Sequence, residues 1–206
     1  MKRLYLLRHG QTEFNVKKLV QGRCDSPLTD LGRQQAQAAA EWLKAHGVVP
    51  DKVVSSPLGR AMDTASLVAC EILGPDATVE PCEGIIERGY GTFEEGPHDA
   101  LPTDVWDPGE DLVPFGGEGS RALQERMVDT LTNLMGAEGI ETLLAVSHGS
   151  ASRQFIKAAA PEGFELPAKL PNCAIMIFDF DDAREEDDTP QCKFTLQQIV
   201  DPQQSH

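Results

Sequence analysis

Short apolar runs alternate along the chain with longer segments in which apolar residues recur at helical spacing. The apolar runs predict strands at residues 3–8, 51–55, 78–81, 142–147, 174–179 and 193–200. The periodic segments predict helices at residues 30–46, 58–73, 121–134 and about 150–160. Because strands and helices alternate with short connections, the pattern favours an α/β fold, with a mostly parallel sheet between helical layers.

The alternating pattern is interrupted once, at residues 94–119. This segment contains eight acids and four prolines, and no Lys or Arg. A long, loop-rich insertion is often a binding loop or a mobile cover over a site, and a plain surface loop is the equal alternative. Elsewhere we find no internal repeat and no linker. We therefore expect a single domain over residues 1–206, with the insertion as a poorly packed, mobile cover.

The formal net charge of −15 argues against nucleic acid and anionic membrane surfaces as partners. This charge is unevenly distributed. Residues 1–60 hold ten Lys and Arg against five Asp and Glu, a balance of +5, so the remainder carries −20. A locally basic segment in an acidic protein suits a small anionic ligand in a focused pocket. Solvated basic helices explain much of this excess, but they do not explain Arg8 at the end of an apolar strand.

Several other features bear on location and metal binding. No apolar stretch approaches the ~18 residues of a membrane span, and the first strand begins too early for a cleaved signal to precede it. The five cysteines lack C-x-x-C spacing, which predicts reduced thiols in a cytoplasmic protein and no zinc site. The acidic run at residues 179–188 lacks the glycine and final glutamate of a calcium loop, so we expect a solvated hairpin tip there.

Two of the predicted strands end in a histidine followed by a glycine. The first strand leads into Arg8-His9-Gly10, and the strand at 142–147 leads into Ser147-His148-Gly149. In α/β folds, ligands lie just beyond the carboxyl ends of the strands. A histidine there can act as a nucleophile, and an arginine can clamp an anion. The two matching strand ends therefore predict a reactive site for an anionic substrate.

A phosphate monoester would need several donors on its oxygens, a nucleophile, and an acid for the leaving alkoxide. His9 is the candidate nucleophile, because an imidazole nitrogen can carry a phosphoryl group. Glu87 is the candidate acid, since it lies between apolar residues and a glycine-rich turn, where desolvation favours the protonated form. The candidate donors all follow strands or turns: Arg8, Thr12, Asn15, Arg60 and His148.

These residues belong to motifs that resemble those of the histidine phosphatase superfamily, which includes the cofactor-dependent phosphoglycerate mutases. The motifs are, in chain order, Arg8-His9-Gly10-x-Thr12-x-x-Asn15, Gln21-Gly22, Ser26-Pro27-Leu28-Thr29-x-x-Gly32, Ser55-Ser56-Pro57-Leu58-x-Arg60-Ala61-x-x-Thr64-Ala65, Glu87 with Gly91, Gly117-Glu118 before Arg126, Ser147-His148-Gly149 and Pro171-Asn172-Cys173-Ala174. One departure is Gly119, where the family commonly has serine. The resemblance implies a three-layer α/β/α sandwich of the phosphoglycerate mutase type, with no metal or organic cofactor.

The resemblance also implies a role for each matching residue. His9 would be the phosphorylated nucleophile, and Glu87 would donate a proton and later activate water. The phosphoryl oxygens would be held by Arg8, Arg60 and His148, with Asn15 assisting. The other residues implied in substrate binding are Thr12, Gln21, Gly22, Arg88, Tyr90 and Gly149. The partner would be a small phosphorylated metabolite, and the oligomeric state, a homodimer included, is left open.

Three functions fit these residues, and a phosphatase fits best. A phosphoglycerate mutase must keep water from a phosphorylated intermediate and needs extra cations over its pocket. Residues 89–120 contain none, although Glu87-Arg88-x-Tyr90-Gly91 does resemble the mutase pattern. An inactive domain that binds a phosphorylated ligand is disfavoured by the complete catalytic set. We further expect the acids of the insertion to repel polyanions and to admit a monoester whose remainder is neutral or basic.

Overall fold

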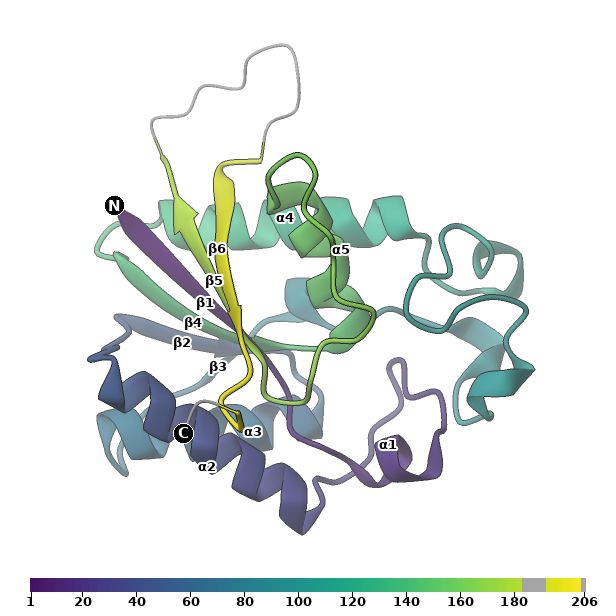
Figure 1. Cartoon of the computed structure of the whole chain (residues 1–206), viewed down its shortest axis with the longest axis horizontal. Coiled ribbons are helices and arrows are strands. Elements are labelled where there is room, and N and C mark those ends of the chain that lie inside the picture. Colours follow the sequence, from purple (N-terminus) through teal and green to yellow (C-terminus); the bar gives the residue numbers. More distant parts are fainter. Residues whose placement is uncertain (183–191, 205–206) are drawn as a thin grey trace.

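The computed structural model describes residues 1–182 and 192–204, in which a six-stranded sheet lies between two layers of helices (Figure 1). The strands are β1 (Lys2–Arg8), β2 (Lys52–Ser55), β3 (Glu80–Pro81), β4 (Thr142–Ser147), β5 (Ile175–Phe180) and β6 (Phe194–Val200). Their order across the sheet is β3-β2-β4-β1-β5-β6. The first four in this order run parallel, and β5 runs antiparallel to both of its neighbours. The predicted α/β fold with a mostly parallel sheet is confirmed.

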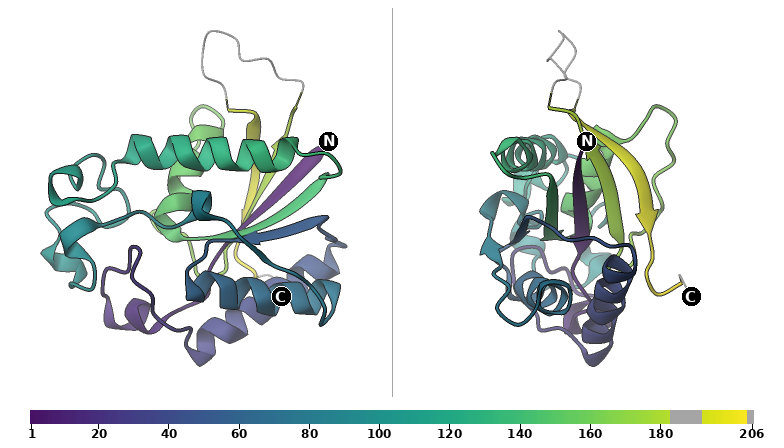
Figure 2. Two further views of the ribbon diagram at one scale, coloured as in Figure 1. Left: turned by 180° about the vertical axis from the view of Figure 1, so that it is seen from behind. Right: turned by 90° about the vertical axis from the view of Figure 1, so that its left-hand side faces the viewer.

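Two pairs of helices cover the two faces of the sheet (Figures 1 and 2). The helices are α1 (Glu13–Lys17), α2 (Asp30–Ala45), α3 (Gly59–Leu73), α4 (Ser120–Gly136) and α5 (Gly149–Ala159). One apolar cluster joins α2 and α3 to the sheet, and a second joins α4 and α5 to its other face. The result is the three-layer α/β/α sandwich that the family resemblance implied.

β1 lies in the middle of the sheet, and this position explains the apolar run from Leu4 to Leu7. Leu4 and Leu6 pack in the cluster of α4 and α5, whereas Tyr5 and Leu7 pack in the cluster of α2 and α3. Side chains alternate between the two faces of a strand, so a strand that is covered on both faces needs apolar residues at every position. The polar residues of β1, Lys2, Arg3 and Arg8, lie at its two ends.

The structure departs from the prediction mainly in segments without strong periodicity. The short helix α1 was not expected, and the insertion contains the single-turn 3₁₀ helices η3 (His98–Ala100) and η4 (Val113–Phe115). The insertion was predicted to be poorly packed. This prediction is wrong, because Leu101 and Leu112 are buried in a small cluster with Val20 and Tyr90. The expected hairpin tip at residues 179–188 lies, from residue 183 onward, outside the described residues.

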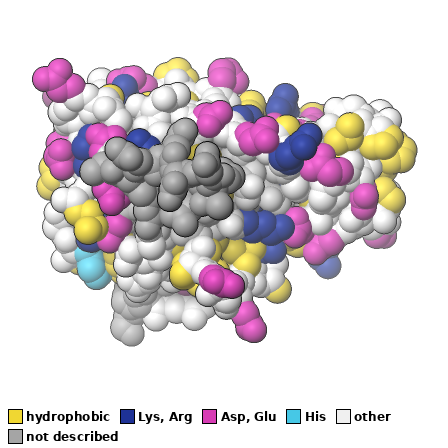
Figure 3. Space-filling view, turned by 90° about the horizontal axis from the view of Figure 1, so that it is seen from above, with side chains coloured by type: hydrophobic (Ala, Val, Ile, Leu, Met, Phe, Trp, Pro, Cys, Tyr) yellow, Lys and Arg dark blue, Asp and Glu magenta, His cyan; other side chains and the backbone are white. Residues whose placement is uncertain are grey.

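On the face seen from above, Lys and Arg side chains lie among Asp and Glu side chains (Figure 3). No helix in the described part of the chain has both the length and the apolar character needed to cross a membrane.

Candidate active site

Three parallel strands deliver their following residues to one edge of the sheet. The last residue of β1, Arg8, is in register with Ser147 of β4, and Val146 of β4 is in register with Ser55 of β2. His9 and His148 therefore leave neighbouring strands side by side. Their ring centroids lie 5.1 Å apart, at an interplanar angle of 61°. The structure thus brings together the two histidines that the sequence placed at strand ends.

His9 is held as a neutral imidazole with one nitrogen available. Its side chain is buried, and its Nδ1 lies 2.7 Å from the carbonyl oxygen of Gly10. A carbonyl can only accept, so Nδ1 carries the proton and Nε2 keeps its lone pair. Burial lowers the pKa of His9 well below its ordinary value, and the charges of Arg60 and Arg8 lower it further. At neutral pH His9 is therefore suited to nucleophilic attack.

His148 is fully buried beside His9. Its Nε2 shares a hydrogen bond of 2.7 Å with the hydroxyl of Ser56, which follows β2. Burial, and then the nearby charge of Arg60, lowers the pKa of His148 well below its ordinary value. The Nδ1 atom of His148 is also buried, and it has no hydrogen-bond partner among the described residues.

Two buried arginines complete the deep end of the site. Arg60, near the start of α3, donates to the carbonyl oxygens of Gly22 and Cys24, each at 2.7 Å. Arg8 donates to the carbonyl oxygen of Leu170. Burial lowers the pKa of Arg8 to about 10, which still leaves its guanidinium charged at neutral pH. Both side chains are thus fixed by backbone carbonyls and keep their positive charge.

Three buried nitrogens in this cluster lack partners within the described ranges: Arg8 Nε, Arg60 Nε and His148 Nδ1. Buried polar atoms in folded proteins are almost always hydrogen-bonded, and each exception calls for an explanation. The three atoms belong to side chains that converge beside His9. An anion with several oxygens would satisfy such donors, and charge-assisted hydrogen bonds to phosphate are among the strongest available.

Glu87 is held at the same site by backbone donors. Its carboxylate accepts hydrogen bonds from the N–H groups of Arg88 (2.8 Å), Ser150 (3.2 Å) and Ala151 (2.9 Å). The last two belong to the first turn of α5, where unpaired N–H groups and the helix dipole favour a carboxylate. Glu87 is buried yet lines the cavity. Its orientation is therefore set by the backbone, with an oxygen within reach of a ligand.

Arg8, His9, Arg60 and Glu87 line a cavity of about 240 Å³ at the carboxyl edge of the sheet. The sequence-predicted residues in its lining are Arg8, His9, Asn15, Gln21, Gly22, Arg60, Glu87, Tyr90 and Gly149. The oxygen of Asn15 accepts from the backbone N–H of Thr12 and the side chain of Asn172. This leaves the Asn15 amide N–H group as the donor for the cavity.

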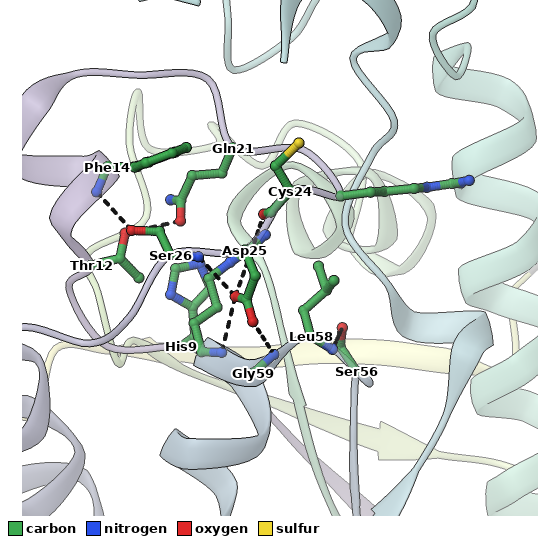
Figure 4. A network of polar contacts seen from close by, with 12 residues as sticks. His9, Thr12, Phe14, Gln21, Cys24, Asp25, Ser26, Ser56, Leu58 and Gly59 are labelled. Carbon is green, nitrogen blue, oxygen red and sulfur yellow. Dashed lines mark hydrogen bonds and ion pairs between the residues drawn. The ribbon is translucent and has the colours of Figure 1, made fainter. Parts of the chain in front are cut away.

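Three of the predicted site residues are not in the cavity lining: His148, which lies beside His9, and Thr12 and Arg88. Thr12 is fully buried, where it caps α1 and donates to Gln21 at 2.9 Å (Figure 4). Arg88 is also fully buried, and it donates to the hydroxyls of Ser150 and Ser120 and to the carbonyl of Glu118. The structure therefore shows Thr12 and Arg88 in contact with other parts of the protein and outside the cavity lining, and their expected role in substrate binding stays a prediction.

Asp25 is a part of the site that the sequence did not indicate. Its carboxylate accepts from the backbone N–H groups of Gly59 (2.7 Å) and Arg60 (3.3 Å) (Figure 4). Helix α3 has Leu58 at its N-cap, which offers no side-chain acceptor. Asp25 therefore caps this helix from a distant segment and helps to fix Arg60, and only the tertiary structure shows the pairing.

The cavity lining also contains side chains that were not predicted: Lys18, His98, Trp106 and Lys169. Trp106 lies in the insertion, with the guanidinium carbon of Arg8 5.2 Å from its ring centroid. Lys18 follows α1, and Lys169 lies in the loop between α5 and β5. Single lysines in loops carry no sequence pattern that distinguishes them from ordinary surface charge, so sequence reasoning had no signal for them.

The expected repulsion of anionic substrates by the insertion is not supported by this geometry. The insertion contributes His98, Val105 and Trp106 to the cavity lining, and none of its acids. Asp107 instead pairs with Lys157 at 2.6 Å on the outer side of α5, and Asp104 accepts from the N–H of Trp106. The expected repulsion stays a prediction, because composition does not say which way the side chains of a loop face, and the charge of Glu94 still acts on Arg60. Within the described ranges, no group of three or more His, Cys, Asp and Glu is placed to hold a metal ion.

Comparison with known proteins gives consistent matches over most of the chain. The family described as histidine phosphatase superfamily (branch 1) matches residues 4–189. The probable phosphoglycerate mutase GpmB of Proteus mirabilis is 32% identical over 186 residues, which cover 87% of this chain and 86% of that protein. The broad-specificity phosphatase YOR283W of Saccharomyces cerevisiae is 34% identical over 166 residues, which cover 75% of this chain and 69% of that protein.

Solved structures match along nearly the whole length. A phosphoserine phosphatase variant from Entamoeba histolytica, in complex with phosphoserine, has a TM-score of 0.75 and 27% identity, with 100% of both chains covered. A mycobacterial glucosyl-3-phosphoglycerate phosphatase has a TM-score of 0.76 and 26% identity, with 96% of this chain and 98% of that chain covered.

Proposed function

Because the chain belongs to branch 1 of the histidine phosphatase superfamily, we propose that it is a phosphatase that hydrolyses small phosphate monoesters through a phosphohistidine intermediate. The observation that carries this proposal is the set of unpartnered buried donors on Arg8, Arg60 and His148, beside the neutral imidazole of His9. A phosphoryl group is the ligand that would use all of these groups at once.

In the first step, Nε2 of His9 attacks the phosphorus atom and the bond to the alcohol oxygen breaks. Arg8, Arg60 and His148 hold the phosphoryl oxygens, where negative charge is concentrated in the transition state. Glu87 acts as the general acid and gives a proton to the leaving alkoxide, after which its carboxylate is stabilised by the backbone N–H donors of Arg88, Ser150 and Ala151. The products of this step are the free alcohol and phosphorylated His9, with Glu87 as a carboxylate.

In the second step, water replaces the alcohol. The Glu87 carboxylate takes a proton from a water molecule as the water oxygen attacks phosphorus. The bond to His9 then breaks, which releases inorganic phosphate and restores the neutral imidazole and the protonated acid. Every group that this cycle requires is a side chain of this protein, so the proposed reaction uses no metal or organic cofactor.

The relatives named as phosphatases support hydrolysis, and a mutase is the second candidate. The yeast relative has broad specificity, and the Entamoeba structure is a phosphatase with phosphoserine bound. The similarity to GpmB and the presence of Lys18 and Lys169 in the lining favour a phosphoglycerate mutase, which would protect the same phosphohistidine from water. The cytoplasmic location and single domain that the sequence predicts stay predictions.

The proposal is tested by incubating the purified full chain with p-nitrophenyl phosphate and a panel of phosphorylated metabolites, and measuring phosphate release. We expect release from small monoesters. In parallel, 3-phosphoglycerate is supplied with a catalytic amount of 2,3-bisphosphoglycerate, and the appearance of 2-phosphoglycerate is followed by NMR. Rapid interconversion with little phosphate release would overturn the phosphatase proposal in favour of a mutase. Tight ligand binding without either reaction would favour an inactive binding domain.

A further inference from the structure

Two lysines from distant parts of the chain line the mouth of the cavity. Lys18 directly follows α1 and Lys169 precedes β5, and both side chains are exposed. Both act on His98, which also lines the cavity. Burial lowers the pKa of His98, and the positive charges of Lys169 and Lys18 lower it further. These three side chains therefore gather on one part of the rim.

Lys18 and Lys169 have no acidic partner among the described residues, whereas most of the other lysines do. Five other lysines form ion pairs: Lys2 with Asp182, Lys17 with Glu13, Lys44 with Glu71, Lys52 with Glu80 and Lys157 with Asp107. A protein with a net charge of −15 has many acids to offer. Within the described lining, Glu87 is the one acid. The cavity mouth therefore carries a surplus of positive charge, which attracts anions.

This surplus of positive charge at the cavity mouth is not needed to bind the phosphoryl group. The deep end already offers the buried donors of Arg8, Arg60 and His148, whereas the two lysines are exposed at the mouth. A monoester bound with its phosphorus at His9 extends its alcohol portion toward the mouth. The lysines therefore face the part of the substrate that leaves, and they are placed to recognise a negative charge on it.

Trp106 fixes the position of Lys169. The ammonium nitrogen of Lys169 lies 5.7 Å from the centroid of the Trp106 ring, a cation–π arrangement. The ring itself packs over Gly149, where a Cβ atom would come within 2.8 Å of it. The segment is anchored on either side of Trp106, by the hydroxyl of Tyr90 on the carbonyl of Val105 (2.7 Å) and by the pairing of Asp107 with α5. Lys169 is therefore held at the rim.

We propose that Lys18 and Lys169 form a second anion subsite, and that the substrate is a phosphate monoester of a small alcohol that carries a carboxylate. The cavity of about 240 Å³ is below the usual range for drug-sized ligands, so the alcohol has only a few carbon atoms. This inference rests on the proposed phosphatase function. It reverses the sequence-based expectation of a neutral or basic alcohol.

The test compares substrates that differ only in the carboxylate. The pairs are 3-phosphoglycerate with glycerol 3-phosphate, and O-phosphoserine with O-phosphoethanolamine. We expect the full chain to prefer the carboxylate member of each pair about tenfold in kcat/KM. Lys18→Gln and Lys169→Gln should each reduce this preference about threefold, and the double variant should abolish it. Lys17→Gln, which removes a neighbouring lysine outside the lining, should keep the preference.

A binding measurement separates failure of the subsite from failure of the proposed reaction. Binding of 3-phosphoglycerate and glycerol 3-phosphate to His9→Ala is measured by calorimetry, with and without the two lysine substitutions. Hydrolysis without any preference for the carboxylate members, in turnover and in binding, would overturn the subsite and leave the phosphatase intact. Lysine-dependent tight binding without hydrolysis would support the subsite and overturn the phosphatase. The preference should also fall as salt is added, because exposed charges are screened.

Discussion

The imidazole ring of His9 lies edge-on to that of His148, with 5.1 Å between the ring centroids, and burial keeps the pKa of both rings well below the ordinary value. Two adjacent imidazoles without positive charge can divide the chemistry between a nucleophile and a group that binds the phosphoryl oxygens. His9 has its proton on Nδ1, and in the proposed reaction its Nε2 attacks phosphorus. His148 is held through Nε2 by Ser56, and its buried Nδ1 has no partner among the described residues, so in the same proposal it is the atom left to bind a phosphoryl oxygen. The following predictions test this division and its supports.

Replacing His9 by alanine should remove turnover while the protein stays folded. We expect the rate to fall by several orders of magnitude, because no other nucleophile lies at the end of β1. Intact-mass spectrometry under non-acidic conditions should detect a phosphoryl adduct on the parent protein during turnover and none on His9→Ala. A rate like that of the parent, with unchanged circular dichroism, would contradict a phosphohistidine intermediate.

Glu87→Gln should slow esters of poorly acidic alcohols far more than esters of acidic phenols. A general acid contributes roughly 10²–10⁴-fold when the leaving group needs a proton, and little when the leaving group is already a stable anion. The measurement is kcat for an alkyl phosphate and for p-nitrophenyl phosphate with the parent and the variant. Equal losses for both substrates would mean that Glu87 holds structure or phosphate and does not deliver the proton.

Asp25→Ala should weaken both the fold and phosphate binding. The variant loses the cap of α3, which typically costs ~1 kcal/mol of unfolding free energy, and releases one restraint on Arg60. We expect KM to rise more than kcat falls, and inorganic phosphate to inhibit less strongly. Asp63→Ala, which removes an exposed carboxylate from the same helix, is the control, and we expect it to change neither quantity. Identical effects in both variants would contradict the positioning role.

Stability should decrease as the pH falls below about 6.5. His9 and His148 have lowered pKa values in the folded state, so between the folded and unfolded pKa the unfolded chain binds more protons. Each histidine then removes ~1.4 kcal/mol of unfolding free energy per pH unit, and this loss is absent above the unfolded pKa of ~6.5. Urea unfolding at pH 7.5, 6.0 and 5.5 measures the slope. His148→Gln should show a smaller slope, and an unchanged slope would show that His148 does not contribute.

The sequence was sufficient to place the two histidines, because local pattern and sheet geometry act together there. His9 and His148 follow central parallel strands, and the carboxyl ends of parallel strands always meet at one edge of the sheet. Their proximity therefore followed from two apolar runs. Asn15 and Arg60 came to the same cavity because they lie in the first turns of the helices that follow β1 and β2, whereas Glu87 reaches it from the long connection between β3 and α4.

The sequence by itself determined the layered fold and most residues at the deep end of the cavity, His9, Arg8 and Arg60 among them. The tertiary structure alone decided that Arg88 and Thr12 lie outside the cavity lining, that Asp25 caps α3, and that Trp106 and Lys169 meet at the rim. Those residues lie in loops, or make contacts with distant segments, whose conformation no backbone period fixes. Their positions depend on which apolar groups are buried, as Leu112 is with Tyr90, and on which acids find partners elsewhere, as Asp107 does with Lys157. That is why charge and proline content alone gave a wrong expectation for residues 94–119.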